Sequence, residues 1–249
     1  MKKQVATSFS VIFLILFYAF QNYYPHIMYL FSNIFPIFIS GVALFSAFLA
    51  LKKYYGKFGS RFSIIWIGIF IGLIFWFLGE FTWGICALFS SSEIPYPSIA
   101  DVFWIIGYIP ILFGLLLYTE TFRKIIPNIR IIGITVLTMV FIISIISIFM
   151  PIIIFEENLI KLIFDLAYPI LDMLLIYAAL LGIAIFFKGK IWKIWIMLCL
   201  GFICYGIADI LFSYTTIIGI YYYGNPLEIL FHLGYILLAL AFHEHIKEF

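Results

Sequence analysis

Carboxylic acids inside long apolar stretches are the residues of this chain with the clearest potential for chemistry. A charged side chain at the centre of a lipid bilayer costs about 2.5–3.5 kcal/mol or more, so such acids usually have a binding, transport or packing role. Only one of them has a basic neighbour one helical turn away, since Lys161 precedes Asp165 by four residues. The six acids are Glu80, Asp101, Asp165, Asp172, Asp209 and Glu228.

Aromatic and polar side chains accompany these acids at helical spacing. Trp76 precedes Glu80 by one turn, and His232 follows Glu228 by one turn. The pattern predicts an outward-facing cleft lined by carboxylates and rings, which would suit a small cationic or amphipathic ligand. The candidate ligand-binding residues are Glu80, Asp101, Asp172, Asp209, Glu228, His232, Trp76, Tyr108 and Tyr235.

The same acids also have a purely structural interpretation. Asp101 and Glu228 lie where helices are expected to begin, and a carboxylate there can cap free N–H groups and interact with the helix dipole. Glu80, Asp172 and Asp209 are expected too far inside their helices for capping. Protonated, these three could join helices by hydrogen bonds.

Two other functions remain open at this point. Oxygen ligands from the acids could hold calcium or magnesium for a metal-dependent intramembrane lipid hydrolase, with His232 as a possible base. Alternatively, acids at matching depths could carry protons or a coupled cation in a transporter. The residue pattern identifies no catalytic residue, metal or cofactor, because it contains no phosphate-binding loop, nucleophile elbow or zinc-ligand motif.

The elements that must position these acids are membrane helices. Of the 249 residues, 66% are hydrophobic and 10% are charged, which is incompatible with a water-soluble surface. Helices satisfy their own backbone hydrogen bonds in lipid, and the apolar runs are much longer than a barrel strand of about 10 residues. We predict an all-α bundle of about eight spans, near 7–22, 30–51, 62–89, 98–118, 131–154, 162–187, 191–218 and 226–246.

Basic residues predict the orientation of these spans. With eight crossings, Lys161 is the only one of the 14 Lys and Arg residues that falls on the opposite side from the others. Because Lys and Arg accumulate in short cytoplasmic loops, both termini are expected to be cytoplasmic in a multi-pass protein of the cell membrane. These scattered basic residues act as topology anchors and predict no nucleic-acid partner.

The chain has one predicted domain, covering residues 1–249, with an internal repeat. The segment 72–80, which ends in Glu80, is echoed by 201–209, which ends in Asp209. Likewise SIADVFWIIGY (98–108) is echoed by NPLEILFHLGY (225–235). The pseudo-repeat halves are 30–118 and 162–246; four spans separate them, so the repeat would be parallel. Glu80 and Asp209 should then face one central space.

Two segments support a family resemblance. PYPSIADVFWIIGYIP (95–110) and DLAYPILDMLLIYAALL (165–181) resemble the multi-helix N-terminal membrane sensor regions of some bacterial diguanylate cyclase and phosphodiesterase proteins. The resemblance implies a sensory function and, since no signalling domain follows Phe249, a separate signalling chain as partner. It marks Ser98, Asp101, Gly107, Tyr108, Asp165, Pro169 and Asp172 as candidate family positions.

Overall fold

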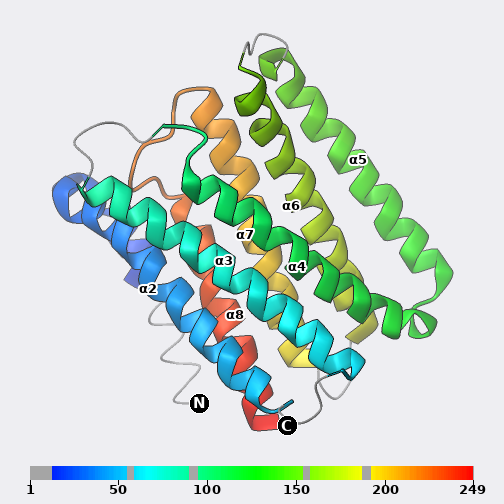
Figure 1. Cartoon of the computed structure of the whole chain (residues 1–249). Coiled ribbons are helices and arrows are strands. Elements are labelled where there is room, and N and C mark those ends of the chain that lie inside the picture. Colours follow the sequence, from blue (N-terminus) through cyan, green and yellow to red (C-terminus); the bar gives the residue numbers. More distant parts are fainter. Residues whose placement is uncertain (1–12, 55–58, 90–94, 154–157, 187–191, 249) are drawn as a thin grey trace.

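The computed structural model describes residues 13–54, 59–89, 95–153, 158–186 and 192–248. Within these ranges the chain is all-helical, as predicted, and seven helices are long and apolar enough to cross a membrane (Figure 1). They are α2 (Pro25–Lys52), α3 (Arg61–Phe89), α4 (Ile99–Thr121), α5 (Asn128–Ile153), α6 (Leu159–Phe186), α7 (Trp192–Ile217) and α8 (Glu228–Glu248). Short 3-10 turns η1 (Gln21–Tyr23) and η2 (Arg123–Ile125) precede α2 and α5.

Residues 13–19 form a further helical segment before η1. They belong to the predicted first span, and residues 7–12 of that span lie outside the described residues. The start of the second span was predicted too late, because α2 begins at Pro25 rather than near residue 30. Proline favours the first turn of a helix, where its missing N–H is not needed, so Pro25 begins the helix and His26 lies inside it.

At the end of the bundle where α2 begins, polar side chains accept hydrogen bonds from the first N–H groups of other helices. The Asn158 side chain accepts hydrogen bonds from the N–H groups of Ile160 and Lys161 at the start of α6. Asp101, at the third position of α4, accepts the Ser98 N–H at 2.7 Å, as the acid of a capping box does. The predicted capping role of Asp101 is therefore present in the structure.

Six of the helices form a closed ring in the order α2, α3, α4, α6, α7 and α8, with α8 packed back against α2. The helix α5 lies outside this ring and packs mainly against α6 (Figure 1). The spans contain 21 to 29 residues in the ring, and helices of that size are about 30–45 Å long, enough for a hydrocarbon core of about 30 Å.

The contacts of the second half repeat those of the first. The pairs α2/α3, α3/α4 and α4/α6 correspond to α6/α7, α7/α8 and α8/α2. Close backbone crossings match as well: a Cβ on Gly72 would lie 2.6 Å from the Gly107 carbonyl oxygen, and one on Gly201 would lie 3.0 Å from that of Gly234. These correspondences define a two-fold pseudo-axis through the ring.

The core along this pseudo-axis is solid. The α3 residues Trp66, Ile69, Leu73 and Trp76 and the α7 residues Trp195, Leu198, Phe202 and Tyr205 occupy equivalent positions and are all buried. Trp76 stacks on Tyr205 with ring centroids 4.0 Å apart. At the other end of the stack, the rings of Trp66 and Trp195 lie 5.9 Å apart.

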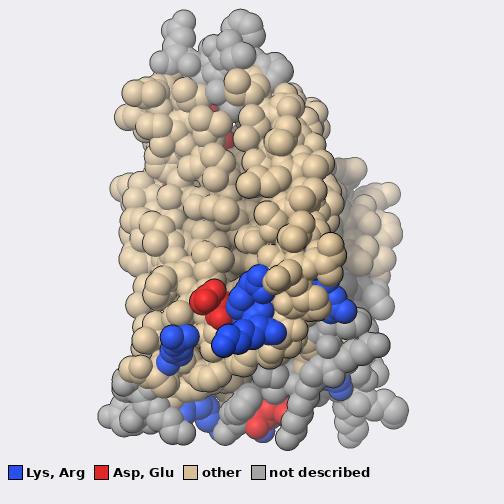
Figure 2. Space-filling view, turned by 90° about the vertical axis from the view of Figure 1, so that its right-hand side faces the viewer, with Lys and Arg blue, Asp and Glu red and all other residues tan. Residues whose placement is uncertain are grey.

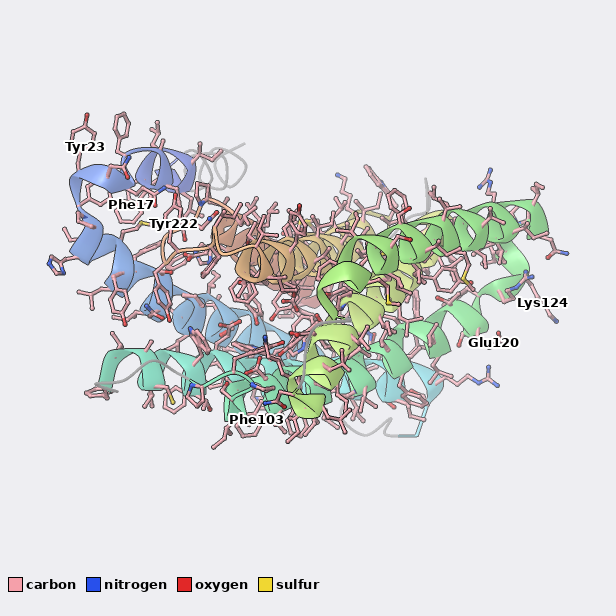
Figure 3. The ribbon with its side chains drawn as sticks, turned by 90° about the horizontal axis from the view of Figure 1, so that it is seen from above. Phe17, Tyr23, Phe103, Glu120, Lys124 and Tyr222 are labelled. Atoms are coloured by element: carbon pink, nitrogen blue, oxygen red, sulfur yellow. The ribbon has the colours of Figure 1, made fainter. Side chains whose placement is uncertain are left out.

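Basic residues gather at one end of the bundle. Described Lys and Arg residues other than Lys161 cluster where α2, α4 and α8 end and α3, α5 and α7 begin, which we call the basic end. Figure 2 shows these side chains gathered near the bottom of the molecule. Figure 3 shows Glu120 and Lys124 far from Tyr23 and Tyr222, which belong to the other end.

Candidate functional site

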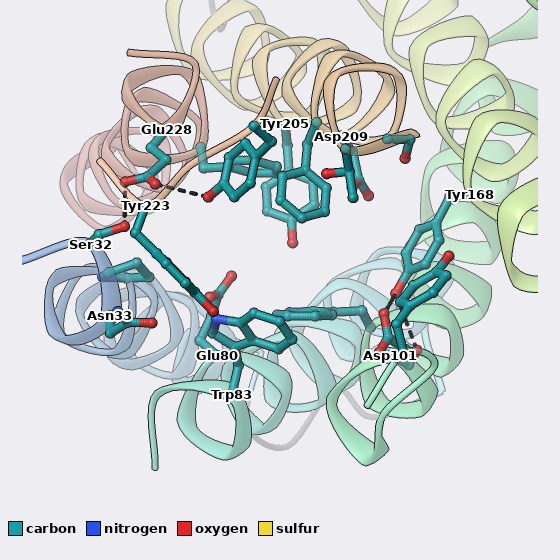
Figure 4. Close-up of a pocket in the computed structure, with 18 of the residues that line it drawn as sticks. Ser32, Asn33, Glu80, Trp83, Asp101, Tyr168, Tyr205, Asp209, Tyr223 and Glu228 are labelled. Atoms are coloured by element: carbon teal, nitrogen blue, oxygen red, sulfur yellow. Dashed lines mark hydrogen bonds between the residues drawn. The ribbon is translucent and has the colours of Figure 1, made fainter. Parts of the chain in front are cut away.

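A cavity of about 560 Å³ occupies the end of the ring opposite the basic end. The starts of α2, α4, α6 and α8 and the final turns of α3 and α7 enclose it, with the segment before α8 (Figure 4). Five of the six acids found in the sequence line this cavity, and Lys161 lines it too. The aromatic lining residues are Trp83, Tyr96, Trp104, Tyr168, Tyr205, Phe212, Tyr221, Tyr222, Tyr223 and Phe231.

Glu80 and Asp209 occupy equivalent positions on α3 and α7 and line the same cavity. Each accepts one hydrogen bond from a tyrosine of the other half of the ring: Tyr235 on α8 donates to Oε1 of Glu80 at 2.9 Å, and Tyr108 on α4 donates to Oδ2 of Asp209 at 3.0 Å. Among the described residues, no further hydrogen bond to either carboxylate meets ordinary geometry. Each acid thus has an oxygen available to a molecule in the cavity.

The indole N–H of Trp104 lies beside Glu80 in this part of the wall. Its Nε1 is buried, packs against the backbone at Gly79 and forms no hydrogen bond of ordinary geometry with the described residues. Glu80 is the neighbouring carboxylate with which this donor interacts.

Glu228 is bound on all sides by donors of the protein. Its Oε1 accepts the Tyr221 hydroxyl and the Gly224 N–H, at 2.9 and 2.8 Å. Its Oε2 accepts the hydroxyls of Ser32 and Tyr18, at 2.6 and 2.9 Å. With four donors the carboxylate joins α2, α8 and the first helical segment, which gives it a structural role.

Asp101 is satisfied in the same way. Its Oδ2 accepts the N–H and the hydroxyl of Ser98, and its Oδ1 accepts the Tyr168 hydroxyl at 2.9 Å. Tyr168 comes from α6, so Asp101 joins α4 to α6 while capping α4. Both acids at the mouth of the cavity are therefore committed to bonds within the protein.

Asp172 lies behind the cavity wall rather than in it. The side chain is fully buried on α6, and its Oδ1 accepts a short hydrogen bond from Tyr108. Its Oδ2 is buried without a partner among the described residues. Trp76, Tyr108 and Tyr235 are also fully buried and form the layer beneath the cavity.

His232 lines the cavity but is 1% exposed and enclosed by rings. The ring of Phe35 lies edge-on at 4.8 Å, and Phe31 lies at 5.8 Å. Its Nε2 is 2.7 Å from the Tyr18 hydroxyl, which also reaches Glu228. The histidine thus continues the hydrogen-bonded network of Glu228.

Residues outside the helices complete the cavity, and sequence reasoning did not find them. Tyr96 donates to Asp165 at 2.7 Å, and Tyr221 donates to Glu228. Burial, together with the neighbouring carboxylate, raises the pKa of both phenols above its ordinary value, so both remain donors at neutral pH. The one available signal was the density of tyrosines in the segment 221–223, just before the acid of α8.

No group of three His, Cys, Asp or Glu side chains in the described ranges is close enough to hold a metal ion. The three cysteines are free, and Cys199 is buried in the core.

The comparisons with known proteins find no matching protein-family model, no similar curated protein and no similar solved structure.

Proposed function

We propose that this multi-pass membrane protein is a sensory, ligand-binding module whose cavity accepts a small amphipathic molecule with a positive charge. The observation that carries the proposal is the pair Glu80 and Asp209, each with an open carboxylate oxygen in one aromatic-walled cavity. A cation would pair with these oxygens, and ring faces would hold its apolar part.

The size of the cavity fits such a ligand. A volume of about 560 Å³ lies within the range of about 300–1,000 Å³ that is usual for small-molecule sites. The walls are mainly aromatic, and few polar groups are free to fix the orientation of a ligand. Among the acids, Asp101 and Glu228 are already saturated, so we assign charge recognition to Glu80 and Asp209.

A sensory role agrees with the packing beneath the cavity. The stacked pair Trp76 and Tyr205 forms its floor, and buried apolar side chains continue below it to Trp66 and Trp195. A bound ligand would contact the top of this stack of buried side chains, and the stack joins α3 to α7. The resemblance to membrane sensor regions supports the same role, with a separate signalling chain as the receiver of the signal.

The experiment is a thermal-stability screen of the purified protein against quaternary ammonium compounds, polyamines and amphipathic amines. The wild-type protein should be stabilised by at least one class, and Glu80→Gln and Asp209→Asn should each lose this stabilisation. Glu120→Gln is the matched control, because Glu120 is exposed near the basic end. Equal stabilisation of wild type and both cavity variants, or none in any of them, would refute the proposal.

Cation- or proton-coupled transport is the second candidate, favoured by the equivalent positions of Glu80 and Asp209 in two parallel halves. Reconstituted protein should then move a cation that stabilises it, or protons, across a vesicle membrane. Flux equal to that of empty vesicles would contradict transport and favour the sensory function. Metal analysis and a lipid-turnover assay on the same preparation test the hydrolase alternative.

A further inference from the structure

The Asp172–Tyr108–Asp209 triad extends inward from the cavity wall, where Asp209 lies, and joins three helices, α6, α4 and α7. The Tyr108 hydroxyl is within hydrogen-bond distance of Oδ1 of Asp172 and of Oδ2 of Asp209. All three side chains are buried, and Asp209, the most exposed of them, is 9% exposed.

Counting hydrogens shows that this triad must hold a proton. A phenol has one hydrogen and can donate only one bond, whereas an ionised carboxylate can only accept. If Asp172 and Asp209 were both ionised, one of the two contacts to Tyr108 would bring two oxygens together with no hydrogen between them. One of the two acids must therefore donate to the phenol oxygen.

The surroundings identify which acid carries the proton. The Oδ2 atom of Asp172 is buried without a partner, so an ionised Asp172 would leave charge unsolvated in an apolar interior. Asp209 lines the cavity, where water or a cation can solvate its second oxygen. Asp172 is therefore the neutral member when the triad is at rest.

We propose that Asp172 is a proton-binding site that exchanges its proton with the cavity through Tyr108 and Asp209. At rest Asp172 donates to the phenol oxygen of Tyr108, and the phenol donates to Asp209. On release, the Asp172 proton passes to the phenol oxygen while the phenolic hydrogen passes to Asp209, which then loses a proton to the cavity. A proton that returns from the cavity binds Asp209, and the reverse sequence restores the proton of Asp172; the phenol is regenerated in both directions. The site requires no particular ligand, so it goes beyond the proposed function.

The other half of the ring lacks this site. Tyr235 occupies the position equivalent to Tyr108 and donates to Glu80, and among the described residues no second carboxylate accepts a hydrogen bond from it. The register that pairs Pro36 with Pro169 places Ile39 opposite Asp172, so no second acid is available there. Other titratable groups also interact with the triad, and all of them are acids or phenols: Tyr205 on α7, Asp101 on α4, Glu80 on α3, Tyr168 on α6 and Tyr96 before α4.

Infrared spectroscopy of the ligand-free protein tests the proposal. A protonated carboxyl group absorbs separately from a carboxylate, and the band shifts in deuterated water. Wild-type protein at neutral pH should show such a band, and Asp172→Asn should lose it. Glu120→Gln is the control, because that acid is exposed near the basic end and its loss should leave the band unchanged. An unchanged set of bands in Asp172→Asn would overturn the assignment.

Tyr108→Phe tests the relay and does not depend on the folding of Asp172→Asn. Loss of the phenol should shift the Asp172 band and slow its exchange with deuterium from the solvent. The matched variant Tyr235→Phe, in the half without the second acid, should leave both unchanged. Normal band position and exchange rate in Tyr108→Phe would overturn the relay. Since no ligand is present, these results stand apart from the outcome of the ligand screen.

Discussion

Hydrogen-bond donors divide the membrane acids of this protein into two kinds. Glu228 has four donors, whereas Glu80 and Asp209 have one each and keep an oxygen for the cavity. The sequence could locate these acids, because each lies in, or at the start of, a long apolar segment. It could not count their donors, since Tyr18 and Ser32 are about 200 positions away from Glu228. The number of hydrogen-bond donors to each carboxylate therefore distinguishes the structural acids from those that can bind a ligand.

The Ser32 hydroxyl joins α2 to α8 through Glu228, at 2.6 Å. We expect Ser32→Ala to lower the free energy of unfolding by about 1–3 kcal/mol, because a buried carboxylate loses a donor. Chemical denaturation in detergent measures this. Ser144→Ala is the control: Ser144 is exposed and bonds only to its own helix, at Val140, so its loss should be nearly neutral. Equal unfolding midpoints for the two variants would contradict the role of Ser32.

At the scale of the helices, small residues fix how closely neighbours approach. Gly68 and Gly72 on α3 meet Gly114 and Gly107 on α4, the close packing expected of their four-residue spacing. The existence of these helices followed from the length of the apolar runs. The residues at which the helices begin and end were harder to predict. Pro25 is an example, because a proline can lie between two helices or in the first turn of the second one.

The α3/α4 crossing should tolerate no added methyl group. A Cβ at Gly72 would lie 2.3 Å from Cγ1 of Ile111, so Gly72→Ala should lower the free energy of unfolding by about 1–3 kcal/mol. At Gly133, on the peripheral α5, nothing lies within 4 Å of a new Cβ. Gly133→Ala should therefore be neutral or stabilising by about 0.5–1 kcal/mol, since alanine favours helix. Similar losses in both variants, measured by thermal unfolding, would contradict this packing.

At the scale of the whole molecule, the ring closes through contacts that no sequence pattern indicates. The interfaces α4/α6 and α8/α2 join helices that are not consecutive, and apolar helices of similar composition offer many such pairings. The matching segments around Glu80 and Asp209 predicted that both acids would share one space. The cavity fulfils this, but its aromatic walls and the solid floor below it required coordinates.

Orientation in the cell membrane remains a prediction, which labelling can test. In a variant without the three native cysteines, a cysteine at Tyr222 should react with an impermeant reagent in intact cells. A cysteine at Lys124, at the basic end, should react only after the membrane is opened, because Lys and Arg mark the cytoplasmic side. The opposite pattern of labelling would reverse the orientation and place the cavity toward the cytoplasm.

The matching contacts of the two halves also predict that the chain can be divided. We expect that fragments 1–125 and 128–249, expressed together, will associate in the membrane and copurify, because the two halves meet through two equivalent interfaces, α4/α6 and α8/α2. Affinity purification through a tag on one fragment measures this. Recovery of the tagged fragment alone would show that the connection at η2 is essential to the ring.

Such a ring has the form of a homodimer whose two subunits have been fused. A half with four crossings, as the sequence predicts, would leave the membrane on the side where it entered, so duplication of its coding sequence would join two copies end to end without inverting either one. Two identical subunits would carry the same residue at every matching position, and therefore two deep acids or none. Asp172 opposite Ile39 is an asymmetry that two identical subunits could not have, because it places a buried carboxyl group in one half of the ring and an apolar side chain in the other.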